Sequence, residues 1–375
     1  MRHISTQNRK VMKKVIYLFA TAALLAACSG NKGYTVTGTV EGAQDGDTIH
    51  LVMMDGRMPV SLATAIVKGG AFSLKGTQDT AQVRYLTLHA PDHCTLAADF
   101  FLENGDIKAD LREEGSSITG TPNNDAYQAI RNQINALSSQ MADIYEQMTD
   151  TTLTDEQRQA KADTMEDLQE QVMDAMKDGI KQNITNAAGI HLLKQNYYQM
   201  DIDELDPLMP QIPAAYSNDE TIVKIKENVE KMKATAVGQK FTDFEMQTPD
   251  GKQVKLSDYA GQGKVVLVDF WASWCGPCRR EMPNLIDTYA KYKNKNFEIV
   301  GVSLDRDAES WQKGIKDLGI TWPQMSDLKY WNCEGAKLYA VSSIPHTVLI
   351  GGDGTILARG LHGDELQEAV AGALK

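Results

Sequence analysis

The stretch FWASWCGPCRREMP, residues 270–283, decides how the last third of this 375-residue chain folds. It joins the apolar run KVVLVDFW to the amphipathic pattern CRREMPNLIDTYAKYK. The run predicts a buried strand that continues to Trp274, and the pattern predicts a helix that begins around Cys275. Two cysteines, Cys275 and Cys278, are therefore expected at the helix N-terminus.

Three kinds of site could use such a pair. A zinc site usually needs four ligands, and no second cysteine pair or closely spaced histidine pair accompanies this one. A purely structural disulfide over so short a loop would restrain little chain entropy, because that gain grows with loop length. A redox centre is favoured, since the unpaired N–H groups of a helix N-terminus stabilise a thiolate. We therefore expect no metal, and no cofactor other than a redox-active disulfide.

Strand and helix patterns alternate on the C-terminal side of this stretch. The runs FEIVGVSL, HTVLI and GTILARG predict strands, whereas AESWQKGIKDLG and GDELQEAVAGAL predict helices. Strands separated by helices are typical of an α/β sheet with right-handed crossovers. Residues 237–375 are therefore predicted to form an α/β domain.

The segment VDFWASWCGPCRREMP, with VGQKFTDFEMQTPDGKQVKLSDYAGQGKVV before it and VSSIPHTVLIGGDGTILARGL after it, resembles the thioredoxin superfamily. The flanking segments resemble its membrane-tethered TlpA/ResA-like branch, over residues 237–375. The resemblance implies a thioredoxin fold and thiol-disulfide exchange. It implies Cys275 as the attacking thiol, Cys278 as the resolving thiol, Asp269 as a buried carboxylate beneath the pair, and Pro283 as a helix-kinking proline.

The same resemblance implies contacts with a protein substrate. Pro345 would be a cis-proline beside the disulfide, and with Ile344 it could offer an extended backbone edge to the partner's strand. Trp274 would shield the disulfide and meet the partner. The dipeptide between the cysteines is that of thioredoxin itself, whereas some cytochrome-maturation members carry other pairs. The predicted substrate-binding residues are Trp274, Gly276, Pro277, Ile344 and Pro345.

Asp269 stands six residues before Cys275, near the end of the predicted buried strand. A central strand rarely tolerates an unpaired charge. If burial raises the pKa of its carboxyl group, Asp269 could accept the proton that Cys278 loses when it resolves a mixed disulfide. A structural aspartate is the alternative.

The N-terminal stretch MKKVIYLFATAALLAACSG, residues 12–30, has two lysines followed by an apolar run too short to span a bilayer of ~30 Å. It is typical of an export signal, and export permits disulfides. The sequence LAAC, residues 25–28, resembles a bacterial lipobox, which implies a signal peptide over residues 1–28 and lipidation of Cys28. That resemblance, with Ser29, implies a lipid-anchored, periplasm-facing protein of the cell envelope, with the outer membrane favoured. An ordinary secretory signal is the alternative.

Residues 34–121 contain short β-like runs separated by glycine or Asp/Asn turns, which predict an all-β domain. With FFLENGDIKADL and SSITGTPNNDAYQAI, they resemble the DUF4369-like, β-sandwich-like domain that precedes thioredoxin domains in envelope lipoproteins of Bacteroidetes. From Tyr127 and again from Met165, apolar residues recur at three- and four-residue spacing, and TDTTLTDE between the two stripes supplies turn and cap residues. Residues 122–235 are therefore predicted to be helical and to begin with a hairpin.

The formal charge of −12, without a Lys/Arg-rich block, argues against a nucleic-acid partner. The leading hypothesis is an envelope oxidoreductase that exchanges disulfides with protein thiols in the reductive direction, supplied by an upstream electron donor. A binding or chaperone-like module with an accessory thioredoxin domain is one alternative. A peroxiredoxin-type peroxidase is another, although it would need a threonine where the chain has Ala272. Cys94 and Cys333 are interpreted as small buried side chains.

Overall fold

The computed structural model of the protein describes residues 33–90 and 92–375. The predicted signal peptide, residues 1–28, and the predicted lipid attachment at Cys28 lie outside the described residues. The chain divides into two compact units, residues 1–195 and residues 196–375. Across the described ranges, none of the helices combines the length and the apolar character needed to cross a membrane.

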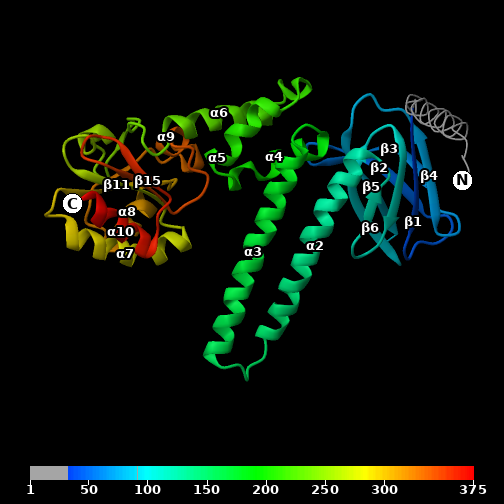
Figure 1. Cartoon of the computed structure of the whole chain (residues 1–375), viewed down its shortest axis with the longest axis horizontal. Helices are drawn as coiled ribbons and strands as arrows, with labels where there is room; N and C mark the ends of the chain where they lie inside the picture. Colours follow the sequence, from blue (N-terminus) through cyan, green and yellow to red (C-terminus); the bar gives the residue numbers. More distant parts are fainter. Residues whose placement is uncertain (1–32, 91) are drawn as a thin grey trace, which may run out of the picture. The chain divides into compact units, whose positions relative to one another are not determined.

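Two four-stranded sheets make up the β domain of the first unit, in the orders β4-β1-β7-β8 and β3-β2-β5-β6 (Figure 1). Strands β1 and β7 are parallel neighbours, and the other neighbours are antiparallel. Inward-facing apolar side chains of both sheets, such as Val36, Leu86 and Phe100, form one core. The expected sandwich-like β domain is thereby confirmed. Its strands are β1 (Tyr34–Val40), β2 (Thr48–Asp55), β3 (Met58–Ile66), β4 (Ala71–Gly76), β5 (Gln82–Ala90), β6 (Cys94–Leu102), β7 (Gly105–Leu111) and β8 (Ser117–Thr119).

Strands β3 and β8 are missing from the predicted β-like runs, which are YTVTGTV, DTIHLVM, AFSLKGT, VRYLTLH, TLAADFFL and DIKADL. Strand β3 lies at a sheet edge, and its larger apolar residues, including Met58 and Leu62, are exposed. Only the small side chains of Ala63 and Ala65 pack against the core. The strand therefore lacks the alternation of large apolar and polar residues by which a half-buried strand is recognised.

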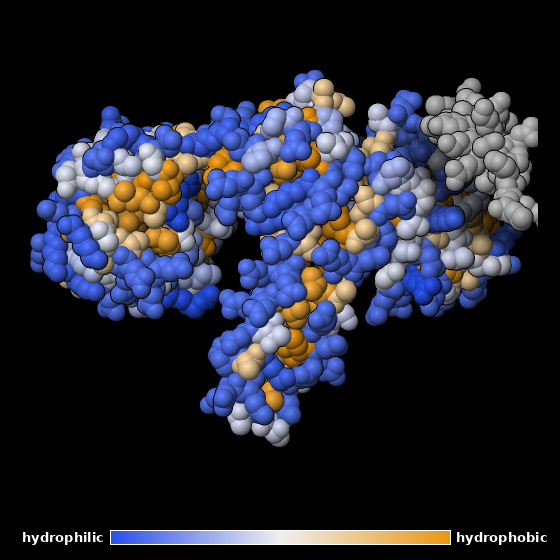
Figure 2. Space-filling view, viewed as in Figure 1, coloured by the Kyte–Doolittle hydropathy of each residue, from blue (hydrophilic) through white to orange (hydrophobic). Residues whose placement is uncertain are grey.

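Helices α2 (Pro122–Met148) and α3 (Asp155–Asn183) lie side by side as the expected hairpin, and α4 (Ala187–Asn196) follows them (Figure 1). Thr154 caps α3: its hydroxyl oxygen accepts from the Gln157 backbone N–H at 3.2 Å, and the Gln157 side chain accepts from the Thr154 N–H at 3.0 Å. Figure 2 shows hydrophobic residues in a stripe along the hairpin. The predicted apolar face of α2 is thus only half-buried at Ile134 and Leu137, whereas Ile130 is buried and lies against Gly179 of α3.

The first turns of α2 are bound to the β domain by buried polar side chains. The Asn124 side chain accepts from the Phe101 N–H at 2.9 Å and donates to the Phe101 carbonyl at 2.8 Å. The Gln128 side-chain oxygen accepts from the Ile118 N–H at 2.9 Å. Strands β6 and β8 each lie at the edge of a sheet, so one side of each strand has no strand neighbour. The side chains of α2 satisfy backbone groups on that side, and α2 thereby covers one edge of each sheet.

The second unit is built on a seven-stranded sheet, in the order β10-β9-β13-β12-β11-β14-β15. Strands β11, β12 and β13 are parallel neighbours, whereas β14 runs antiparallel to β11. Every residue of β11 is buried, as expected for the central strand of an α/β sheet. The strands are β9 (Glu245–Gln247), β10 (Gln253–Lys255), β11 (Val265–Trp271), β12 (Phe297–Ser303), β13 (Gln324–Ser326), β14 (His346–Ile350) and β15 (Ile356–Arg359).

Helices of this unit contribute Met282, Leu285, Trp311 and Leu366 to a core shared with the sheet, and the predicted α/β thioredoxin-type fold is confirmed. The helices that follow β11 in the chain are α7 (Gly276–Tyr292), α8 (Ala308–Asp317), α9 (Glu334–Leu338) and α10 (Gly363–Ala373). One expected boundary was wrong: β11 ends at Trp271 rather than continuing to Trp274. The backbone turns there, and the Cys275 N–H donates to the Ala272 carbonyl at 3.1 Å.

Residues 196–235, the end of the predicted helical segment, belong to the second unit. It contains α5 (Ile202–Leu205) and α6 (Glu220–Ala234), with short 3₁₀ turns before and between them at Tyr197–Gln199, Asp206–Gln211 and Ala214–Tyr216. Arg359, on β15, donates to the carbonyl and the hydroxyl oxygens of Thr235, at 3.0 and 2.8 Å, where α6 ends. A cation at a helix C-terminus also interacts favourably with the negative end of the helix dipole, so this contact holds α6 against the sheet.

The two cysteines outside the pair and the predicted lipobox are free thiols. Cys333 is fully buried, as expected, and burial raises its pKa to about 11. The expectation for Cys94 was wrong, because its side chain is only partly buried at the start of β6, where its thiol donates to the Glu41 carbonyl.

Candidate active site

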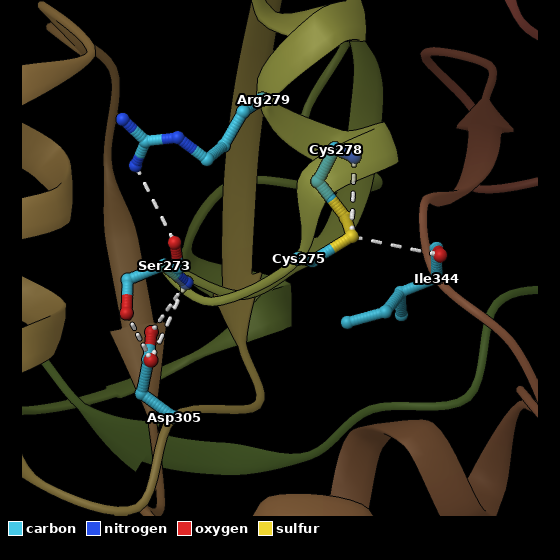
Figure 3. The surroundings of a disulfide bond; sticks show 6 residues. All are labelled: Ser273, Cys275, Cys278, Arg279, Asp305 and Ile344. Atoms are coloured by element: carbon cyan, nitrogen blue, oxygen red, sulfur yellow. Dashed lines mark hydrogen bonds between the residues drawn. A yellow bond between two sulfur atoms is a disulfide. The ribbon is translucent and has the colours of Figure 1, made fainter.

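A disulfide joins Cys275 and Cys278 where α7 begins (Figure 3). Cys275 is the N-cap residue, and its sulfur accepts a hydrogen bond from the Cys278 backbone N–H at 3.1 Å. Both residues are nearly inaccessible, with exposed fractions of 4% and 1%. When the bond is reduced, that N–H and the positive end of the helix dipole stabilise negative charge on the Cys275 sulfur, so the geometry favours a thiolate there.

Gly276 and Pro277 are the first two residues of α7 and are both exposed. Proline is well tolerated at this point, because the N–H groups of a first helical turn have no partner within the helix. The dipeptide therefore presents accessible backbone directly over a buried disulfide. Pro283 lies inside the same helix.

The carboxyl group of Asp269 is buried in the middle of the sheet. Asp269 pairs with Gly301 of β12 on one side and with Thr347 of β14 on the other, and it is 1% exposed. Among the described residues, its Oδ2 atom has no hydrogen-bond partner. Burial, with a smaller contribution from the negative charge of Glu281, raises the pKa of Asp269 to about 7. This carboxyl group can therefore gain or lose a proton at neutral pH.

A second buried aspartate, Asp305, holds the turn that precedes the disulfide (Figure 3). Its carboxylate accepts from the Ser273 hydroxyl at 2.6 Å and from the Ser273 backbone N–H at 3.1 Å. It also accepts from the Ser303 hydroxyl at 2.7 Å. Asp305 follows β12, the parallel neighbour of β11, so both segments leave the sheet at the same edge. The hydrogen bonds thus fix the backbone just before Trp274 and Cys275.

The loop before β14 lies on the other side of the disulfide. The peptide bond between Ile344 and Pro345 is cis, as the resemblance implied. The Ile344 carbonyl oxygen lies 3.6 Å from Cys275 Sγ, and Figure 3 shows it facing the sulfur. Because β14 pairs with β11, the sheet register brings this loop to the disulfide although the two are far apart in the sequence.

His346 follows the cis-proline and is held neutral. Burial, followed by the positive charges of Arg359 and His362, lowers the pKa of His346 to about 3. Its Nε2 atom lies 3.5 Å from an Arg359 nitrogen, so the neutral ring can accept a hydrogen bond from the guanidinium. His346 is therefore part of the contact between β14 and β15, and it is not suited to proton transfer near neutral pH.

The predicted site residues fall into three places in this unit. Cys275, Cys278, Gly276 and Pro277 form the helix start, Ile344 and Pro345 form the facing loop, and Asp269 lies within β11. Trp274 is 46% exposed beside the helix start.

Sequence reasoning missed Asp305 and Glu281. A carboxylate directly after a predicted parallel strand is a signal that could have identified Asp305, because such residues gather at the carboxyl edge of the sheet. Within residues 33–90 and 92–375, no group of three or more His, Cys, Asp or Glu side chains is arranged to hold a metal ion.

The raised pKa of Asp269 predicts how stability depends on pH. The folded unit binds the Asp269 proton more tightly than the unfolded chain does, so this group's stabilising contribution is lost as pH rises from 3.8 to about 7. In Asp269→Asn this loss is absent. The free energy of unfolding of the oxidised variant, relative to the wild type, should therefore rise between pH 4 and pH 8 by an amount on the order of 4 kcal/mol.

Urea unfolding followed by tryptophan fluorescence measures this difference, because all five tryptophans, Trp271, Trp274, Trp311, Trp322 and Trp331, lie in the second unit. Asp287→Asn, at an exposed position on α7, is the matched control and should show no such trend. A difference between Asp269→Asn and the wild type that is the same at both pH values would contradict the raised pKa.

Comparison with known proteins extends these observations. Residues 237–359 match the AhpC/TSA family, and residues 34–127 match a domain of unknown function, DUF4369. The chain is 37% identical over 142 residues to the thiol-disulfide oxidoreductase ResA of Oceanobacillus iheyensis, in an alignment covering 37% of this chain and 66% of that protein. It is 31% identical over 142 residues to the ResA of Bacillus thuringiensis, covering 37% of this chain and 77% of that protein.

Among solved structures, the thioredoxin domain of a thiol-disulfide oxidoreductase from Bacteroides vulgatus is 36% identical, with a TM-score of 0.35, covering 37% of this chain and 99% of that chain. Residues 237–359, which match the AhpC/TSA family, contain the buried central strand, the disulfide at the start of α7 and the cis-proline loop. The similarity to the curated relatives extends over most of their own length, 66% and 77%. By its C-terminal domain, the chain belongs to the thioredoxin-fold thiol-disulfide oxidoreductases of the ResA family.

Proposed function

We propose that the protein exchanges disulfides with protein substrates of the cell envelope through Cys275 and Cys278, in the reductive direction. The observation that supports this most directly is the N-cap position of Cys275, whose sulfur accepts the Cys278 N–H. Cys275 is the more exposed of the two cysteines and faces the cis-proline loop. It is therefore the attacking thiol, and the more deeply buried Cys278 is the resolving thiol.

The exchange proceeds in two steps. The Cys275 thiolate attacks one sulfur of the client disulfide, so a mixed disulfide forms and the client's other sulfur leaves as a thiolate. Cys278 then loses its proton and attacks Cys275 Sγ, which closes the Cys275–Cys278 disulfide and releases the second client thiolate. Two electrons pass to the client, and an upstream dithiol donor must return two electrons to the pair. The Cys275–Cys278 pair carries these two electrons in its dithiol form, so no bound cofactor is needed.

A tethered second thiol makes the resolving step intramolecular, which raises its effective concentration. A lowered pKa of Cys275 adds only modestly to the rate of attack, because intrinsic nucleophilicity falls as thiol pKa falls.

If this mechanism holds, Cys278→Ser should accumulate mixed disulfides between Cys275 and client proteins in cells, because the resolving thiol is missing. Non-reducing electrophoresis and mass spectrometry would identify the trapped clients. The matched control is the double variant Cys275→Ser/Cys278→Ser, which can form no bond at this site. Capture by Cys278→Ser no greater than by the double variant would remove the support for an exchange function.

Cells that express the wild-type protein test the direction of exchange. A reductive protein should hold most of the wild-type pair as dithiol, which thiol alkylation under denaturing conditions detects as a mass shift. A mostly oxidised pair would contradict the reductive direction. If the protein instead has a binding or chaperone-like role that does not need the disulfide, cells with Cys275→Ser should have the same phenotype as cells with the wild type.

Asp269 is proposed to accept the proton of Cys278 in the resolving step. Its pKa of about 7 suits this role, and its Oδ2 atom has no competing partner among the described residues. Asp269→Asn should leave the attack by Cys275 nearly unchanged but slow release of the mixed disulfide about 10²-fold at pH 8. At pH 5.5 the wild-type carboxyl group is itself protonated, so the two proteins should release the client at similar rates.

Stopped-flow measurement with a peptide disulfide separates the two steps, and Asp287→Asn is again the matched control. Equal release rates for wild type and Asp269→Asn at pH 8 would make Asp269 structural. A slower first step in the variant would instead mean that the Asp269 charge acts on Cys275.

The envelope location is proposed from the sequence LAAC, which ends at Cys28, and from the apolar run that contains its first three residues. The protein is proposed to be anchored by lipid on Cys28, to face the periplasm and to be sorted to the outer membrane. Because several acyl chains anchor a protein stably, Cys28→Ser should move it to the soluble fraction of lysed cells. Cys94→Ser, a substitution of a free thiol in the β domain, should stay with the membrane. Membrane-bound Cys28→Ser would show that another anchor exists.

A further inference from the structure

The loop of residues 327–333, between β13 and α9, has an unusual backbone. Leu328 and Tyr330 both have positive φ angles, of 55° and 57°, although neither is glycine. Such a conformation is unfavourable for a residue with a bulky side chain, and it persists only where the surrounding structure enforces it. Two such residues within three positions indicate that the loop shape is maintained against its local preference.

Hydrogen bonds hold this loop at both ends. The Ser326 hydroxyl oxygen accepts from the Leu328 N–H at 3.1 Å. The Asp327 carboxylate accepts from the Lys329 N–H at 3.1 Å and from the Glu334 N–H at 2.9 Å. The Cys333 N–H donates to the Tyr330 carbonyl at 3.0 Å, and the Cys333 side chain is buried beneath the loop. The loop is therefore a fixed support and not a loose connection.

What this loop presents is a pair of aromatic rings next to Trp274. The ring centroid of Tyr330 lies 5.1 Å from that of Trp274 and 6.0 Å from that of Trp331, and the centroids of Trp274 and Trp331 are 6.4 Å apart. Trp274 is 46% exposed and Trp331 is 37% exposed. We call these three side chains, Trp274, Tyr330 and Trp331, the aromatic platform.

Two further observations show how the platform is held and where it lies along the chain. The Arg306 guanidinium lies over the Tyr330 ring, 3.9 Å from its centroid, which holds the ring from the adjoining loop. Trp274 stands between Ser273, which Asp305 fixes, and Cys275, the N-cap residue of α7. Tyr330 is therefore held from a second loop, and Trp274 directly precedes the cysteine that the proposed function makes reactive.

We propose that the aromatic platform is a docking surface for the polypeptide that flanks a client's reactive cysteine, and that the client residue bound there is apolar or aromatic. This inference rests on the proposed function, because a client whose sulfur bonds to Cys275 must cover the surface next to it. On one side of that sulfur is the backbone of the cis-proline loop at Ile344, which can hold an extended strand but selects few side chains. Trp274, the residue before Cys275, forms with Tyr330 and Trp331 a group of three adjacent rings, which gains most from burying an apolar side chain.

The test uses two peptides of equal length, each with one cysteine held in a mixed disulfide with glutathione. One peptide has tryptophan beside the cysteine and the other has serine, so neither neighbour adds charge. The reduced full-length protein is mixed with each peptide, and the rate at which the mixed disulfide is reduced is measured. This rate is divided by the rate at which dithiothreitol reduces the same peptide. The wild type should prefer the tryptophan peptide about tenfold, and Trp331→Ala should lower this preference to about twofold or less.

Three controls make the result decisive. Trp331→Phe should keep most of the preference, because it retains a ring. Leu357→Ala removes a side chain of similar exposure, 40%, on β15 of the same unit and should keep all of it. Hydroxyethyl disulfide, which has no flanking polypeptide, reports whether each variant is folded and competent for exchange.

The platform proposal is overturned if the wild type shows no preference, or if Trp331→Ala keeps the tenfold preference. In either case the reaction with hydroxyethyl disulfide would still proceed. Failure of the proposed function is a different result, in which the wild-type protein reacts with neither peptide nor with hydroxyethyl disulfide.

Discussion

The hydrogen bonds from Ser273 to the buried Asp305 carboxylate fix the turn on which the rest of the site depends. Strand β11 ends at Trp271, and Cys275, the N-cap of α7, follows only four residues later. Within this short distance the chain must leave a buried sheet, expose Trp274 and aim the Cys275 sulfur at a backbone N–H. Asp305 supplies the acceptors that make one such path favourable, because the carboxylate would otherwise be a buried charge without partners.

The two buried aspartates near the disulfide show how environment sets the role of one residue type. Asp305 accepts three hydrogen bonds from two serines and so acts as an anchor. Asp269 lies within a strand whose backbone groups are taken up by β12 and β14, and its Oδ2 atom has no partner among the described residues. Its charged form is therefore unfavourable, which raises its pKa to about 7 and suits it to proton transfer.

In the proposed mechanism, the cis-proline loop and the aromatic platform have different roles in recognition of the client. The cis-proline loop provides a backbone edge at Ile344, which any extended polypeptide can meet. The aromatic platform provides side-chain surface, held by the strained loop of residues 327–333 and by Arg306. A protein that must bind several clients with different sequences gains from such a division, because the backbone contact is general and the apolar contact adds selectivity.

Much of the fold and part of the site could be predicted from the sequence. Continuous apolar runs such as VVLVDFW identified the central strands, three- and four-residue spacing identified the α2–α3 hairpin, and the spacing of the two cysteines identified the disulfide. These are local signals, because burial of a strand and the start of a helix depend on residues close together in the chain. Short or exposed strands, such as β3 and β13, were not recognised, since pairing with distant neighbours rather than their own pattern places them in a sheet.

By itself, the sequence determined the secondary structure of the catalytic segment and the residue types available there, because helix and strand periodicity and the position of cysteines at a helix start are local properties. Only the tertiary structure decided which distant residues meet at the disulfide. Asp305 reaches Ser273 because β12 lies beside β11, Ile344 reaches Cys275 because β14 pairs with β11, and Tyr330 reaches Trp274 through a loop held in an unfavourable backbone conformation. Sheet order, register and strained loops depend on contacts between segments far apart in the chain, and no short stretch of sequence contains them.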